Sequence, residues 1–254
     1  MVQQRLNSPS FNPPHPLLPA VLGQEEVKIR LWKAISKGRW AKGYLITGPM
    51  GVGKRALAIE LARILNCEGD SIKSWSGECS CRSCHLLRDG EHPHLIWLTP
   101  FQGRDDGKAK GREGFYSWVK EQISSPYQSL NLSDSDRILV EGVREIKQEL
   151  AYRLDRPGYR CVVIYPAGAM NDNAANALLK ILEEPPERTV FFILAESPRE
   201  LLPTIVSRCQ TIYLKRLSLE EVEEGLRRYG RSTGIENNKD RSEFPAPLPS
   251  SLNK

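Results

Sequence analysis

The chain has 254 residues, with 36 Lys and Arg against 31 Asp and Glu, which gives a formal net charge of +5. A hydrophobic share of 40% is enough for a packed core, and 26% charged residues without a long apolar run exclude a membrane-spanning segment. The first residues lack the basic start and apolar block of a secretory signal, so we expect a cytoplasmic protein without a membrane partner. Its six cysteines are then expected to be thiols or metal ligands.

In chain order, the pattern begins with a proline-rich, extended lead-in over residues 1–20 and a helix over residues 25–37. Short apolar runs predict strands over residues 43–47, 95–98, 138–140, 161–165 and 190–195. Helical spacing of apolar residues predicts helices over residues 55–66, 141–154, 172–184 and 217–229. Alternation of apolar strands with helices predicts an α/β fold, in which helices cover a parallel sheet on both faces.

Two stretches lie outside this pattern. Residues 99–136 are rich in Gly, Lys, Arg, Asp and Ser, and we interpret them as a polar insertion with a short helix near residues 116–122. Residues 231–254 are polar and contain prolines, which predicts a disordered tail. The chain is therefore divided into the lead-in, a domain over residues 21–216 and a final segment over residues 217–254.

The sequence from Gly48 to Lys54 has the pattern of a phosphate-binding loop. Gly48, Gly51, Gly53 and Lys54 stand between a predicted strand and a predicted helix. Glycines let backbone N–H groups point at phosphate oxygens, the helix N-terminus adds positive potential, and the lysine reaches the outer phosphates. The next position usually holds a magnesium-binding Ser or Thr, but here it is Arg55. We therefore expect at most weak binding of ATP or ADP, without a regular magnesium site.

Hydrolysis of ATP by such a loop also needs an Asp at the end of a second strand to hold magnesium, usually beside a Glu that orients water. The predicted strand over residues 161–165 runs instead into Tyr165 and Pro166. The loop is present without the catalytic carboxylates, which favours a fold that no longer hydrolyses ATP.

Cys67, Cys79, Cys81 and Cys84 follow the spacing C-x11-C-x-C-x2-C. Four neighbouring thiolates suit the tetrahedral geometry of structural zinc, and a closed site of this kind leaves no position for catalysis. Because a single residue separates Cys79 from Cys81, His85 is an alternative fourth ligand. Free or redox-active thiols are the other interpretation.

Longer motifs carry a resemblance to a known family. They are Gly23-Gln24, the glycine loop, the cysteine segment after it, residues 176–186 (NALLKILEEPP) and residues 202–209 (LPTIVSRC). Together they resemble bacterial clamp-loader subunits of DNA polymerase III, which are AAA+ proteins, over residues 21–217. The resemblance implies an AAA+ P-loop fold with a zinc insertion over residues 67–84. Family members continue into a lid and a helical collar, so residues 217–254 are expected to hold at most the start of a lid.

The resemblance also implies a function. The gamma and tau motor subunits carry an Asp-Glu pair where this chain has Tyr165 and Pro166, and this departure resembles the delta-prime class. Such subunits do not hydrolyse ATP, and the arginine of their Ser-Arg-Cys motif, Arg208 here, serves the ATP of a neighbouring motor subunit. The implied partners are gamma/tau and delta subunits and, through the assembled complex, the sliding clamp and primed DNA.

Two alternatives from other functional classes stay open. One is an active ATPase similar to gamma or tau, against which Tyr165 and Pro166 argue. The other is a zinc-containing DNA-binding module, favoured by Lys108, Lys110 and Arg112 in the polar insertion. Acidic residues are interleaved with these cations, which favours a solvated loop.

Overall fold

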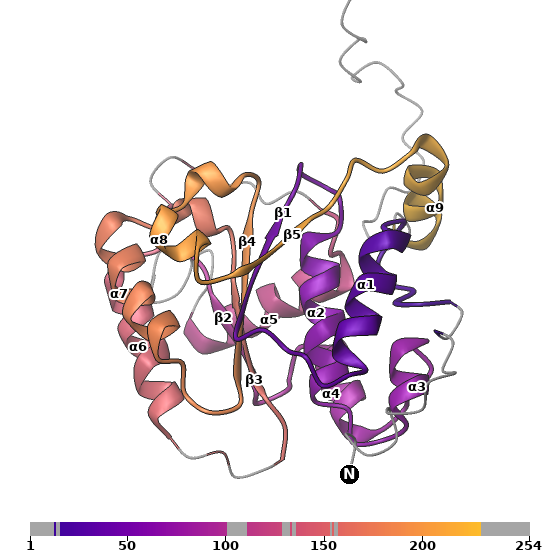
Figure 1. Cartoon of the computed structure of the whole chain (residues 1–254), viewed down its shortest axis with the longest axis horizontal. Helices are drawn as coiled ribbons and strands as arrows, with labels where there is room; N and C mark the ends of the chain where they lie inside the picture. The colour runs from indigo at the N-terminus through magenta and orange to yellow at the C-terminus, as the bar shows by residue number, and fades with distance from the viewer. Residues whose placement is uncertain are drawn as a thin grey trace, which may run out of the picture.

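The computed structural model describes residue 13 and residues 16–100, 111–128, 133, 136–152, 154 and 157–229. Within these residues, five strands form one parallel sheet with helices on both of its faces (Figure 1). The strands are β1 (Gly43–Thr47), β2 (Leu95–Leu98), β3 (Arg160–Ile164), β4 (Thr189–Ala195) and β5 (Gln210–Tyr213), and their spatial order is β2-β3-β4-β1-β5. All carboxyl ends therefore lie at one edge of the sheet.

Nine α-helices lie in the described part of the chain. They are α1 (Glu25–Ile35), α2 (Lys54–Leu65), α3 (Ser71–Trp75), α4 (Arg82–Asp89), α5 (Gly111–Ser124), α6 (Val140–Ala151), α7 (Asp172–Glu183), α8 (Pro203–Val206) and α9 (Leu219–Tyr229), with short 3-10 turns η2 (Ala167–Ala169) and η3 (Pro198–Glu200). Among these residues, every helix is too short or too polar to cross a lipid bilayer.

Alternate strand residues pack into two separate cores. Tyr44 and Ile46 of β1 belong to the core that includes residues of α1, α2 and α5, whereas Leu45 belongs to the core of α6 and α7. Every residue of β1, β3 and β4 is buried, as expected for strands covered on both faces. The predicted α/β class and its parallel sheet are confirmed.

The predicted strand over residues 138–140 is wrong. Ile138 forms a single parallel bridge with Met170, and α6 begins at Val140. Ile138 is buried, but Leu139 is 46% exposed and precedes the helix as its N-cap. A run of three apolar residues is too short to separate a strand from a buried helix start. Sequence reasoning also missed β5, in which only Ile212 is buried.

The polar insertion over residues 99–136 contains a longer helix than expected. Helix α5 contacts α2 and α4, its Val119 is buried, and Trp118 lies edge-on to Trp97 of β2 with the ring centroids 5.8 Å apart. Residues 101–110 lie outside the described residues. The described part of the insertion is thus packed against the core.

The two ends of the chain are described in part. Of the expected extended lead-in, residues 16–20 form bends and a turn, in which Leu17 and Leu18 are buried and the Leu18 N–H donates to the Trp75 carbonyl. The expected tail over residues 231–254 lies outside the described residues.

Candidate functional site

The glycine loop, residues 48–53, joins the carboxyl end of β1 to the first residue of α2. Gly48, Gly51 and Gly53 have φ angles of 146°, 76° and 94°, a region that side chains disfavour. A Cβ atom at Gly48 would overlap the carbonyl oxygen of Leu214, and one at Gly53 would lie 2.9 Å from the Tyr127 hydroxyl. The loop therefore has a backbone conformation that requires glycine at these positions, as predicted for a phosphate-binding loop.

Lys54 is folded back onto this loop. Its Nζ donates to the Gly48 carbonyl at 2.6 Å and to the Pro49 carbonyl at 2.7 Å, and the residue is 8% exposed. Burial lowers the pKa of Lys54, and the charges of Glu196 and Glu200 offset part of that shift. The ammonium group is thus satisfied by the loop's own backbone.

The two positions that depart from the ATPase pattern contact each other. Arg55, which is 4% exposed, places its guanidinium 5.0 Å from the ring centroid of Tyr165 and donates to the Gln128 carbonyl. Burial lowers the pKa of Arg55 and raises that of Tyr165. A cation over an aromatic face is an attractive arrangement in a desolvated site. In an ATPase, the region beside this lysine holds the ligands for magnesium. Here a guanidinium and a phenol ring occupy that region.

A cavity of about 420 Å³ lies over this region. The charged residues that line it are Lys54, Arg55 and Arg137 and the acidic Asp136, Glu196 and Glu200. Three cations and three carboxylates give no net positive charge for a polyphosphate. The Glu200 carboxylate accepts from the N–H of Ser197 at 3.0 Å and caps η3, which gives it a structural partner.

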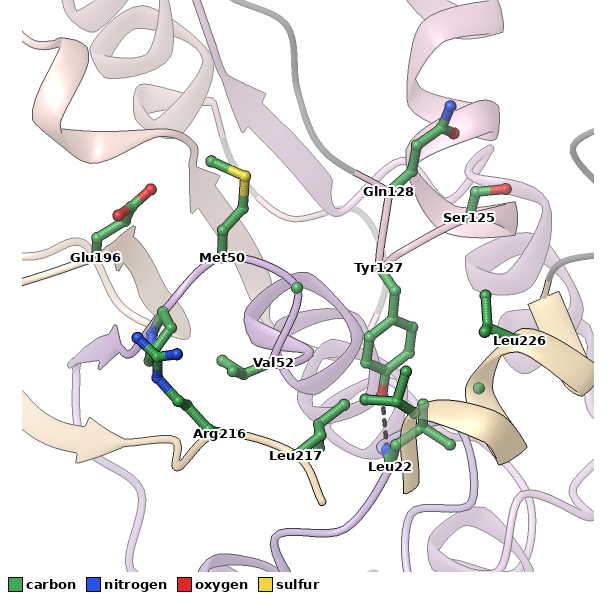
Figure 2. Close-up of a pocket in the computed structure, with 14 residues that line it drawn as sticks. Leu22, Met50, Val52, Ser125, Tyr127, Gln128, Glu196, Arg216, Leu217 and Leu226 are labelled. Carbon is green, nitrogen blue, oxygen red and sulfur yellow. Dashed lines mark hydrogen bonds between the residues drawn. The ribbon is translucent and has the colours of Figure 1, made fainter. Parts of the chain in front are cut away.

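A second cavity, of about 770 Å³, also adjoins the loop and shares Met50, Tyr127 and Glu196 with the first (Figure 2). Leu22, Val52, Tyr127, Leu217 and Leu226 contribute to its lining. Because these residues come from the segment before α1, the loop, the segment after α5 and the region of α9, the cavity joins parts of the chain that are distant in sequence. Its lining is mostly apolar.

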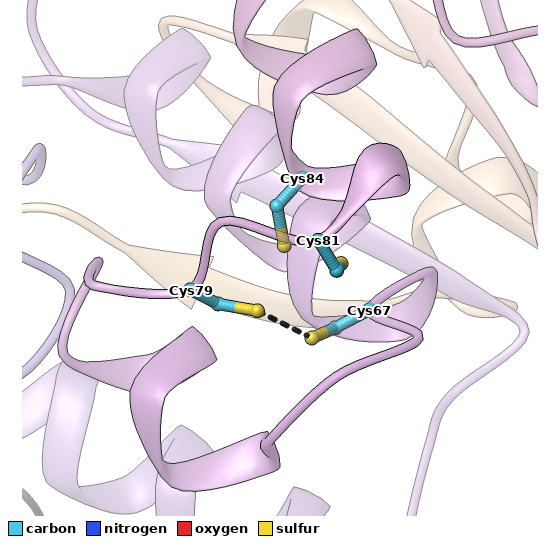
Figure 3. A group of neighbouring side chains, drawn as sticks. All are labelled: Cys67, Cys79, Cys81 and Cys84. Carbon is cyan, nitrogen blue, oxygen red and sulfur yellow. Dashed lines mark hydrogen bonds between the residues drawn. The ribbon is translucent and has the colours of Figure 1, made fainter.

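The four predicted metal ligands come together, as Figure 3 shows. The sulfur atoms of Cys67, Cys79, Cys81 and Cys84 all lie within 4.8 Å of one another. A tetrahedral zinc site with Zn–S bonds of about 2.3 Å has S···S edges of about 3.8 Å, so these thiols can close around such an ion with small shifts. His85 is exposed and does not belong to the group. All six cysteines are free thiols, without a disulfide.

The surroundings of the cysteine cluster affect its four thiols differently. Against the effect of burial, hydrogen bonds lower the pKa of Cys81, whereas burial raises the pKa of Cys79. A hydrogen bond with Cys84 lowers the pKa of Cys67 to about 5, and the same bond raises that of Cys84. Gly69 lets the backbone approach, because a Cβ there would lie 2.9 Å from the Cys79 sulfur. Arg63 of α2 interacts with Cys84 from the protein side. Cys67 and Cys81 therefore have increased acidity, and the cluster has a neighbouring cation, both of which favour thiolate ligands.

Arg208 lies between the end of α8 and the start of β5. Its guanidinium donates to the Thr204 carbonyl at 3.0 Å and to the Glu183 carboxylate at 2.8 Å, and its side chain is 36% exposed. A half-exposed pair of this kind contributes at most about 1 kcal/mol. Arg208 is therefore oriented in the chain but is easily released to another anion.

Arg208 lies at the opposite edge of the sheet from the glycine loop. A Cβ at Gly43, the first residue of β1, would lie 3.8 Å from the Arg208 carbonyl oxygen, whereas the loop follows the last residue of β1. Five strand residues span roughly 16 Å at about 3.3 Å each. The guanidinium is therefore too far away to serve a phosphate in its own loop.

Sequence reasoning missed several residues of these sites. Tyr127 and Gln128 were not predicted as site residues, because residues 99–136 were interpreted as a polar insertion. Aromatic residues scattered through this segment could have indicated that it packs against the core. Glu183 has no distinguishing signal in the sequence, because a glutamate near the end of a helix is usually exposed, yet it orients Arg208. Arg63 has no sequence signal of its own, because an arginine in a helix is usually exposed.

Comparisons with known proteins show the family of this chain. A family model described as "DNA polymerase III, delta subunit" matches residues 23–218. The chain belongs to this family. The matched residues include the glycine loop, the cysteine cluster and Arg208.

Individual relatives are named as subunits of DNA polymerase III. DNA polymerase III subunit delta' of Pseudomonas aeruginosa is 36% identical over 180 residues, which cover 70% of this chain and 45% of the relative. The Escherichia coli delta' subunit is 31% identical over 73% of this chain and 46% of its own length. The Escherichia coli tau subunit is 29% identical over 81% of this chain and 26% of its own length. The chain thus spans less than half the length of these three relatives.

A solved DNA polymerase III gamma subunit-related protein from Thermotoga maritima is 20% identical, covers 76% of this chain and 51% of its own, and has a TM-score of 0.40.

Proposed function

We propose that this chain is a delta-prime-type clamp-loader subunit of DNA polymerase III, which does not hydrolyse ATP and supplies Arg208 to the ATP of a neighbouring subunit. One observation carries the proposal. The end of β3 presents Tyr165, packed under Arg55, at the place where a hydrolysing relative needs a carboxylate and a hydroxyl for magnesium. Family membership and relatives named delta' and tau support the setting.

The charge balance of the smaller cavity supports the absence of hydrolysis. Magnesium needs oxygen ligands, and Arg55 brings a positive charge to the position of one of them. Lys54 already has two backbone acceptors at short distance. A triphosphate would have to displace these contacts without gaining a metal ion to neutralise its charge. We therefore propose weak binding of ATP or ADP and no turnover.

The position of Arg208 supports action on another subunit. Its own loop lies at the far edge of the sheet, and the guanidinium is held at the surface by an exposed pair with Glu183. In the transition state of phosphoryl transfer, charge spreads over the equatorial oxygens, and an arginine from a second protein can stabilise it. We propose the gamma/tau subunit as the neighbour, with the delta subunit, the sliding clamp and primed DNA as further partners in the cytoplasm.

The remaining elements complete the proposal. Residues 21–216 form the AAA+ domain, the cysteine cluster binds one structural zinc ion within residues 67–84, and α9 begins a lid. Lys54 is the first residue of α2, and Cys67 follows the other end of this helix, which has 12 residues and is about 18 Å long. The zinc insertion therefore stabilises the fold at a distance from the nucleotide contacts.

The first test measures ATP hydrolysis by the purified chain. We expect no turnover above background, and the same background in Lys54→Ala. Turnover in the wild-type protein that disappears in Lys54→Ala would favour the active-ATPase alternative. DNA binding by the isolated chain that depends on its bound metal would instead favour the zinc-module alternative.

The second test reconstitutes the clamp loader with wild-type or Arg208→Ala protein and measures ATPase activity with clamp and primed DNA. Turnover at the site facing Arg208 is expected to fall by on the order of 10³, so that the total rate loses that site's share. Arg208→Lys should rescue poorly, because an ammonium lacks the planar fork. Arg199→Ala, which changes an exposed arginine at the other edge of the sheet, is the matched control. Equal rates with confirmed incorporation would mean that Arg208 is an ordinary surface residue.

A further inference from the structure

Tyr127 lines both cavities beside the glycine loop, as its neighbour Gln128 does. It belongs to the short segment that follows α5, and Figure 2 shows its ring extending from that segment toward Leu22. The adjacent Gln128 accepts a hydrogen bond from Arg55. Tyr127 is therefore adjacent to a residue that is bonded to the first turn of α2.

The Tyr127 hydroxyl bridges two backbone groups of the segment before α1. It accepts from the N–H of Leu22 at 2.6 Å and donates to the carbonyl of Ala20 at 3.0 Å. A phenol can do both at once because its oxygen is donor and acceptor. Adenine likewise presents an amino donor beside a ring-nitrogen acceptor. These backbone groups, which have the polarity to bind such a base edge, are thus already engaged.

The Tyr127 ring also packs over the glycine loop. A Cβ at Gly53 would lie 2.9 Å from the hydroxyl oxygen and 3.0 Å from Cε1 of the ring. Gly53 is the N-cap of α2, immediately before Lys54. An aromatic ring beside a phosphate-type loop, with its polar atom on neighbouring backbone groups, has the position and chemistry of a nucleobase.

We propose that Tyr127 takes the place of a purine base, so that this residue decides whether the glycine loop accepts a nucleotide. A purine nucleotide binds only when Tyr127 is displaced, whereas a phosphate compound without a base meets no such competition. The inference goes beyond the role of Arg208 and does not depend on it, since it concerns the isolated chain. It identifies one residue that sets the low affinity for nucleotide.

The test titrates ADP and inorganic pyrophosphate separately into wild-type protein, Tyr127→Ala and Tyr127→Phe, and measures binding by calorimetry. Tyr127→Ala removes the two hydrogen bonds of the phenol, to Leu22 and Ala20, and the volume of the ring, so we expect ADP to bind on the order of tenfold more tightly. Pyrophosphate affinity should stay within about twofold. Lys54→Ala in the Tyr127→Ala background should abolish the gain, and Tyr152→Phe, at a residue that is 76% exposed, is the matched tyrosine control.

Unchanged ADP affinity in Tyr127→Ala overturns the proposal. An equal gain for ADP and pyrophosphate also overturns it, because Tyr127 would then act on the loop and not on a base position. If thermal melting shows that Tyr127→Ala is unfolded, Tyr127→Phe decides. That variant keeps the ring but loses the two hydrogen bonds that hold it in place, so a several-fold gain for ADP alone supports the proposal, and no gain contradicts it.

Discussion

The buried ion pair between Glu60 and Arg63 of α2 gives a sharp prediction about stability. Both Glu60 carboxylate oxygens accept from the guanidinium, at 3.1 Å and 2.6 Å, and Arg63 also donates to the Ser74 hydroxyl at 3.2 Å. Burial disfavours the charged guanidinium, but the charge and hydrogen bonds of Glu60, with a contribution from Cys84, leave the pKa of Arg63 raised above its usual value. The guanidinium therefore stays charged at every accessible pH.

The expected cost of breaking this pair follows from its burial. The Arg63 and Glu60 side chains are 1% and 10% exposed, so Arg63→Met leaves a carboxylate without its partner in a desolvated place. Such a change costs about 3–5 kcal/mol, out of roughly 5–15 kcal/mol for a folded domain. At about 2–4 °C per kcal/mol, the melting temperature should fall by about 6–20 °C. The double variant with Glu60→Leu should recover most of this loss, because no buried charge remains.

Urea unfolding of metal-loaded protein measures these free energies. Arg227→Met is a matched control, since Arg227 and Glu224 form the same i,i+3 pair on α9 with side chains 72% and 40% exposed. The control should change the free energy of unfolding by about 0.5 kcal/mol or less. Glu60→Gln keeps Arg63 beside Cys84, so it separates loss of the pair from loss of metal. A cost for Arg63→Met no larger than for Arg227→Met, with metal content unchanged, refutes the reasoning.

The other predictions concern cysteine. Metal analysis of a reduced preparation should find about one zinc ion per chain, and Cys84→Ser should lose it together with the stability of residues 67–84. A substoichiometric wild-type protein contradicts the site. Burial raises the pKa of Cys209 to about 11, so little thiolate exists at pH 8. Its alkylation by iodoacetamide should rise about tenfold per pH unit up to that value, whereas an ordinary thiol levels off above its pKa of about 8.5. A rate for Cys209 that levels off near pH 9 contradicts the shift.

The parts that sequence predicted best are those with a local physical signature. Glycines before a lysine at a strand-to-helix junction are typical of a phosphate-binding loop. Gly48, Gly51 and Gly53 all have the positive φ angles that such a loop requires. The four thiols come together even with the short gap at Ser80, since Cys81 is the N-cap of α4 and Cys84 lies in its first turn. Long apolar runs located β1, β2, β3 and β4 within a residue of their observed bounds.

The parts that sequence could not predict depend on contacts between distant segments. Tyr127 meets Leu22 across 105 positions, and Arg208 meets Glu183 across 25. The periodicity of apolar residues along the sequence does not indicate such pairs of distant residues. The prediction of a strand over residues 138–140 was wrong for the opposite reason. It relied on a local apolar run, but Ile138 forms a single bridge and α6 begins at Val140.

The two edges of the sheet divide the chemistry of this chain. At the carboxyl edge, Arg55, Tyr165 and Tyr127 fill the surroundings of the glycine loop, so the loop keeps its shape without depending on a bound metal. At the opposite edge, Arg208 is held by one exposed carboxylate and one carbonyl. The contacts of Arg208 with Thr204 and Glu183 involve no residue of the glycine loop. In the proposed function, this separation means that the neighbouring subunit's ATP, and not a nucleotide bound to this chain, draws the guanidinium away from Glu183.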